Sequence, residues 1–214
     1  FDIIKMSTQL KEIENFLPKC CFTCCSMLEN IKFPTLLKTI EDNCFARCGS
    51  QKSVNIFNIE NSIGDGVFME CSSLTSIFIG GSATKFGKNT FKDCTSLIDV
   101  KIPPLVKKIG LGLCSGCTNL PYFELPDQLE EIPDYTFYQC SNLETVNVLC
   151  NITKIGFMAF LRCELLKEYK VPATVKSIGA SCFMGCNLLK ICVPKTVESL
   201  GENCFKECKK VKRV

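Results

Sequence analysis

The stretch FKDCTSLIDVKIPPLVKKIG at residues 91–110 contains the pattern that decides the fold. The pattern returns as FLRCELLKEYKVPATVKSIG at residues 160–179, with an aromatic residue, a cysteine three positions later, a leucine, alternating apolar residues, a proline and a glycine. Apolar residues that alternate, as Val100 and Ile102 do, indicate a strand with one buried face. Because proline cannot donate to a β-ladder, Pro103 is expected to end that strand.

The unit is a repeat with a period of 23 residues, and its last interval is 22 residues because one residue is missing between Cys186 and Pro194. Its aromatic slot holds Phe22, Phe45, Phe68, Phe91, Cys114, Phe137, Phe160, Phe183 and Phe205. A unit of this size cannot bury its own apolar face, so successive units are expected to stack into a solenoid with parallel strands about 4.8 Å apart.

A glycine follows the strand in most repeats, as at Gly110 and Gly179. Its recurrence at one slot suggests a positive φ or a tight bend. The segment that runs from this glycine to the next cysteine is too short for a full helix, so we predict a single helical turn there.

The combined pattern, LxxIxIPxxVxxIGxxxFxxC, resembles the BspA-like class of leucine-rich repeat, which is known in surface proteins of some bacteria and in large families of parasitic protists. The resemblance implies an α/β repeat fold: a right-handed solenoid of about nine coils with a parallel β-sheet face and short helical turns. For function it implies only recognition of a protein or another ligand, often in adhesion or scaffolding. It identifies no binding residues, because a shared fold does not carry a site with it.

Both ends of the chain depart from the repeat. In residues 1–21 the apolar residues have helical spacing, which predicts an amphipathic capping helix that runs into a half repeat, and residues 22–214 are assigned to the solenoid. The last residues, Val211 and Val214, fall inside an expected strand without an evident cap. Either the chain is cut from a longer one, or a second copy covers the open end as a homodimer, or the edge is bare and charged.

Composition excludes several functions. The 214 residues are 46% hydrophobic, with a formal net charge of +3. No apolar stretch approaches the roughly 18 residues of a transmembrane helix, and the small charge gives no reason to expect binding to nucleic acid. With no histidine, no phosphate-binding glycine motif and no recurring pair of carboxylates, we expect no enzyme, no catalytic residue and no cofactor.

Eighteen cysteines raise the question of their chemistry, and nine of them occupy the repeat's cysteine slot. A disulfide scaffold, a zinc site at CCFTCC (residues 20–25) and a redox pair at CSGC (residues 114–117) are the alternatives. We favour reduced structural thiols without a metal, because a buried thiol behaves as a small apolar group. That choice favours a cytoplasmic or inner-membrane-side location. The cell surface is the alternative, which glycosylation at Asn151 would support.

The exposed positions of the expected sheet provide a candidate binding site for a protein partner. Apolar or aromatic residues stand at three of these positions in the middle of the chain, and charged residues flank them, as in a protein-binding hot spot. The predicted site consists of Phe78, Ile98, Asp99, Lys101, Tyr122 and Glu124.

Overall fold

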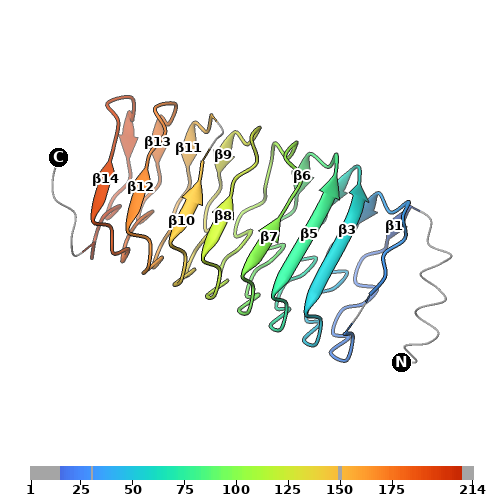
Figure 1. Cartoon of the computed structure of the whole chain (residues 1–214). Coiled ribbons are helices and arrows are strands. Elements are labelled where there is room, and N and C mark those ends of the chain that lie inside the picture. The colour runs from blue at the N-terminus through green and yellow to red at the C-terminus, as the bar shows by residue number, and fades with distance from the viewer. Residues whose placement is uncertain (1–14, 30, 149–150, 209–214) are drawn as a thin grey trace.

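The computed structural model describes residues 15–29, 31–148 and 151–208. These residues form a parallel-sheet solenoid of about eight turns in which each coil stacks on the one before it (Figure 1). The prediction of about nine coils is wrong by one, because nine aromatic slots delimit eight complete intervals. The predicted capping helix and half repeat cover residues 1–21, of which residues 1–14 lie outside the described residues, as do the terminal Val211 and Val214.

One face of the solenoid, here called the first sheet, carries the longer strands. They are β3 (Ser53–Ile59), β5 (Ser76–Gly81), β7 (Asp99–Lys101), β8 (Tyr122–Glu124), β10 (Thr145–Asn147), β12 (Glu168–Lys170) and β14 (Lys190–Cys192). Hydrogen bonds join them as β3-β5-β7, β8-β10 and β12-β14, always in parallel. These are the strands that the alternating apolar residues predict.

A second face, here called the second sheet, is made of two-residue strands. They are β1 (Phe16–Leu17), β2 (Thr39–Ile40), β4 (Ser62–Ile63), β6 (Lys85–Phe86), β9 (Glu131–Ile132), β11 (Lys154–Ile155), β13 (Ser177–Ile178) and β15 (Ser199–Leu200). They pair in parallel as β1-β2-β4-β6 and β9-β11-β13-β15. The strand β1 shows that the half repeat before Phe22 supplies the first rung of this sheet.

Prolines interrupt both sheets between the same two coils. In the first sheet the Ile98 N–H donates to the Thr75 carbonyl at 2.9 Å, but the equivalent residue one coil later is Pro121. In the second sheet the Gly110 N–H donates to the Phe86 carbonyl at 2.9 Å, and its equivalent is Pro133. Because proline has no N–H, neither bond can form at this boundary.

The segments between the second sheet and the cysteine slot are turns, so the predicted helical turns are wrong. No residue in the described ranges is helical. Left-handed residues two positions before and two positions after the aromatic slot stop helix growth, as at Asn43 (φ 54°) and Arg47 (φ 63°). The turn's N–H groups therefore leave their own coil: the Phe45 N–H donates to the Val67 carbonyl of the next coil at 2.9 Å.

The repeated glycine has a different role from the expected positive φ, because the φ values of Gly110 and Gly179 are not in the left-handed region. A Cβ atom at Gly179 would lie 2.4 Å from the Phe157 nitrogen and 2.5 Å from the Gly156 carbonyl carbon. Real Cβ atoms essentially never approach so closely. At Gly110 and Gly179 glycine is required because the backbones of successive coils touch there.

Two ladders run through the core among buried leucine, isoleucine and valine side chains. Phenylalanine rings stack coil on coil, with Phe160 and Phe183 centroids 5.1 Å apart and their planes 5° from parallel. Beside them eight of the nine ladder cysteines, from Cys48 to Cys208, donate their thiols to the carbonyl of the residue in the aromatic slot of the preceding coil, as Cys94 does to Phe68 at 3.0 Å. The cysteine slot therefore needs a small apolar side chain that can also donate one hydrogen bond.

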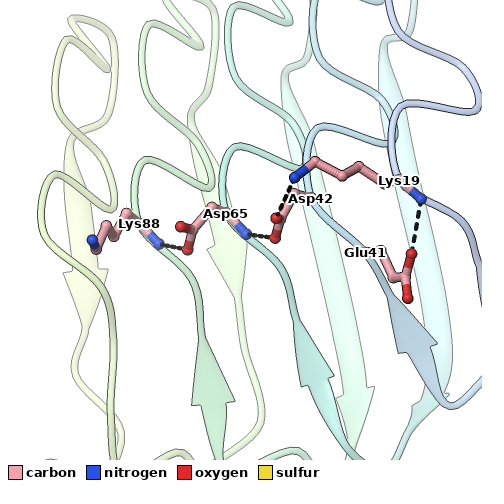
Figure 2. Close-up of polar contacts among 5 residues, drawn as sticks. All are labelled: Lys19, Glu41, Asp42, Asp65 and Lys88. Carbon is pink, nitrogen blue, oxygen red and sulfur yellow. Dashed lines mark hydrogen bonds and ion pairs between the residues drawn. The ribbon is translucent and has the colours of Figure 1, made fainter.

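Aspartates after the glycine slot link neighbouring coils from outside the core. The Asp65 N–H donates to Asp42 Oδ1 at 2.9 Å, and the Lys88 N–H donates to Asp65 Oδ1 at 2.7 Å (Figure 2). The bond from the Asp65 N–H is the main reason why the pKa of Asp42 is lowered, and Lys19 at 3.2 Å adds to the effect. These carboxylates occupy backbone donors that the turns leave unpaired.

Candidate interaction surface

The first sheet presents alternate residues to solvent, and aromatic side chains gather at one end of it. The Phe57 and Phe78 rings lie 5.6 Å apart on β3 and β5, with 67% and 38% of their surface exposed. Beside them stands Gly80, which has no side chain and would place a Cβ 3.1 Å from the Phe78 ring. The result is an apolar shelf made by Phe57, Phe78 and Gly80, here called the aromatic shelf.

The longer strands β3 and β5 produce this shelf. The proline slot of the repeat, filled by Pro103 in the next coil, holds Phe57 and Gly80 in the two preceding coils. Because neither residue removes a ladder donor, β3 and β5 continue beyond the position where the later strands end. Phe57 is a residue that the sequence reasoning missed, and its place in the proline slot is the signal that could have found it.

Five of the six predicted site residues lie on the neighbouring strands β5, β7 and β8 (Figure 1), and the sixth, Ile98, immediately precedes β7. Phe78 on β5 lies opposite Lys101 on β7, and Asp99 lies opposite Ser76. Ile98 precedes Asp99 at the start of β7 and is about 10 Å along the strand from Lys101, given three residues of rise. The Phe78 ring therefore packs against Phe57 and lies beside Lys101, at the other end of β7 from Ile98.

The remaining predicted residues lie across the proline interruption, on β8. Tyr122 and Glu124 point outward from that strand, opposite Thr145 and Asn147 of β10. Ile98 and Tyr122 are both exposed, while Val100 and Phe123 between the outward positions are buried. All six residues thus belong to the solvent face of the first sheet, with the aromatic shelf at one side and Tyr122 at the other.

The cysteines fit structural positions. Burial raises the pKa of Cys48 to about 12 and that of Cys114 well above its ordinary value. A protonated thiol is a poor nucleophile, so these buried groups are unsuited to redox chemistry. Where the chain is described, no three cysteine or acidic side chains converge on a point that could hold a metal ion.

Cys114 breaks the ring stack, and two phenylalanine rings from other positions of the repeat pack near it. The Phe86 ring packs beside Phe91 at 6.3 Å, and the Phe123 ring packs beside Phe137 at 5.1 Å, one on each side of the missing ring. In CCFTCC, Cys20 and Cys24 are exposed, whereas Cys21 and Cys25 are partly buried in the repeat. Residues of this segment therefore point in different directions.

The chain belongs to the family of the BspA type leucine rich repeat region, whose model matches residues 2–114 and 84–212. Proteins built from such repeats are generally protein-interaction or surface modules. Across residues 15–208, apart from the gaps, no helix has the length and apolarity to cross a membrane.

Solved structures show the same architecture. A leucine rich repeat protein of T. pallidum is 27% identical, with a TM-score of 0.66 over 71% of this chain and 71% of that one. A leucine-rich repeat protein from Bacteroides ovatus is 25% identical, with a TM-score of 0.67 over 92% of this chain and 57% of that one. A leucine rich cell surface protein from Faecalibacterium prausnitzii is 23% identical, with a TM-score of 0.58 over 91% of this chain and 45% of that one. The chain thus spans about half the length of the last two. No curated protein matches it.

Proposed function

We propose that this chain is a non-enzymatic recognition module that binds a protein partner on the exposed face of its first sheet. The observation that carries the proposal is the aromatic shelf. Two phenylalanine rings in contact, held on extended strands and open to solvent, give a rigid apolar anchor that costs little conformational entropy on binding.

The charged residues beside the shelf support a role in selecting the partner. Lys101 lies directly opposite Phe78, and Asp99 lies two residues earlier on the same strand. In this arrangement an apolar side chain of the partner packs against the rings, while Lys101 and Glu124 require charges of opposite sign around it. Apolar anchors provide affinity, and such flanking charges provide specificity and a faster association.

The location that best agrees with this function is a reducing one, on the cytoplasmic side. The ladder thiols from Cys48 to Cys208 support it, because each of them donates a hydrogen bond to a backbone carbonyl, and a disulfide would remove that bond. A role in adhesion at the cell surface, or self-association through a solenoid end, is the alternative. Formation of disulfides in the protein isolated from its cells would favour that alternative.

The test is affinity capture from a lysate of the source cells with three baits. These are the wild type, a Phe57→Ser/Phe78→Ser variant, and a Leu36→Ser/Leu200→Ser control that removes two exposed leucines outside the first sheet. Circular dichroism establishes that all three are folded. A protein captured by the wild type and the control but not by the shelf variant supports the proposal. Equal capture by all three baits would refute it.

A further inference from the structure

The interruption of the second sheet opens a groove on the face away from the aromatic shelf. In the described residues no hydrogen bond joins residues 107–110 to residues 130–133, although the coils before and after are bonded at this level. A groove of about 650 Å³ lies there, within the range of roughly 300–1,000 Å³ typical of small-molecule sites. Pro133 causes the missing hydrogen bond, because proline has no N–H, whereas the glycines at the six equivalent positions of the repeat have one.

One wall of the groove is strongly basic. It is lined by Lys85, Lys88, Lys107 and Lys108. Lys85 and Lys108 face each other directly across a parallel bridge, an arrangement of like charges that destabilises a sheet. The ion pairs found among the described residues include none of these four lysines.

The acidic residues that line the groove leave this wall without a paired counter-charge. Asp65 uses Oδ1 to accept the Lys88 backbone N–H, and the Lys88 ammonium group extends away from it (Figure 2). Glu131 is paired with Lys154, on the far side of the interruption, at 3.9 Å. Glu130 lines the opposite wall. The basic wall is therefore available to an anion, and Glu130 is available to a hydroxyl donor.

Backbone donors complete the site. The Ile109 and Glu130 N–H groups have no hydrogen-bond partner in the described part of the chain, and both residues line the groove. In the intact rungs the groups equivalent to Glu130 are paired: the Lys107 N–H donates to the Thr84 carbonyl at 2.9 Å. Unpaired N–H groups beside lysines are the donors that bind phosphate and sulfate oxygens in proteins.

We infer that this groove binds a small polyhydroxylated ligand that carries at least two phosphate or sulfate groups, such as a phosphorylated polyol or a sulfated sugar. Two oxyanions relieve the repulsion between Lys85 and Lys108 and engage Lys88 and Lys107. The free hydroxyl groups of the ligand donate to Glu130 and Thr153 on the other wall. The site is independent of the aromatic shelf, because it lies on the other sheet and uses none of the same residues.

The test is isothermal titration calorimetry with inositol hexakisphosphate and, separately, with a sulfated heparin disaccharide. Inorganic sulfate and an unsulfated disaccharide are the control probes. Binding of one organic probe and not the other identifies the phosphate or the sulfate source. Failure of both to bind the wild-type chain, or binding of inorganic sulfate as tightly as the organic probes, would overturn the inference.

Matched variants separate the groove from general attraction to a basic protein. Lys85→Ala/Lys108→Ala is expected to weaken binding at least about tenfold, because two charged contacts are lost. Lys170→Ala/Lys190→Ala changes the net charge equally on the first sheet and is expected to leave the affinity within about twofold. Equal losses in the two variants would contradict the site.

A third variant tests the groove without changing any charge. Pro133→Gly restores the N–H that the repeat has at its other glycine slots, which allows the second sheet to close between Ile109 and Pro133. The variant is expected to fold and to bind the organic probes more weakly than the wild type. Unchanged affinity in a variant whose Ile109 amide has become protected from hydrogen exchange would show that the groove is not the binding site.

Discussion

Substitution of Gly179 by alanine tests the reason why the repeat needs glycine. The added Cβ would lie 2.4 Å from the Phe157 nitrogen, about 1 Å closer than ordinary contact. The two coils must separate by that amount, which breaks the bonds from Gly179 N–H to the Ile155 carbonyl (2.8 Å) and from Met158 N–H to the Ala180 carbonyl (3.0 Å). Two lost hydrogen bonds cost about 1 kcal/mol each, and overpacking costs about 1–3 kcal/mol.

The expected loss of unfolding free energy for Gly179→Ala is therefore about 3–5 kcal/mol, measured by urea denaturation followed by circular dichroism. Gly49→Ala is the matched control, because its Cβ would meet no atom within 4 Å and its φ is not left-handed. That variant should change stability by no more than about 1 kcal/mol in either direction. If Gly179→Ala is as stable as Gly49→Ala, coil contact is not the reason for the glycine slot.

Three further predictions concern the thiols and the interruption. Burial raises the pKa of Cys48 to about 12, so near pH 9 the unfolded chain loses this proton while the folded chain keeps it. The free energy of unfolding should therefore be full below pH 9 and fall above it by about 1.4 kcal/mol per pH unit for each such thiol, which denaturation at pH 8 and pH 10 will measure. Cys21 and Cys44 have sulfur atoms 3.0 Å apart, so exchange with oxidised glutathione should join them first and release reduced glutathione, whereas peptide mapping that finds only ladder disulfides would contradict this. The Ile109 amide should exchange with deuterium faster than the Ile155 amide, and equal protection would show that the second sheet is continuous.

The sequence was sufficient for the architecture because the repeat is regular. Alternation within LIDVKI placed β7, and the fixed interval of the aromatic slot implied stacked phenylalanine rings. The helical turn was wrong because spacing does not reveal φ. A clue was present in Asn43, Gly66, Asn89 and Gly112, which recur every 23 residues and belong to the types that tolerate a left-handed conformation.

The candidate surfaces depended on contacts between repeats, which a single unit does not display. Phe57 escaped notice because the strand was expected to end before it, and only the extended β3 brings its ring to Phe78. Lys85 and Lys108 stand 23 residues apart, so their pairing follows from the period alone. The groove beside these lysines cannot be predicted from the period, because its volume depends on how far the coils separate where Pro133 removes a hydrogen-bond donor.

The measurement that tests the proposed function most directly is the dissociation constant of the captured partner for purified wild-type chain and for a Phe78→Ser variant. A hot-spot ring contributes about 2 kcal/mol or more, so the account predicts affinity at least about 30-fold weaker for Phe78→Ser and unchanged affinity for Leu200→Ser. Equal affinity of the wild type and Phe78→Ser, together with a loss in Leu200→Ser, would place recognition away from the first sheet and contradict the account.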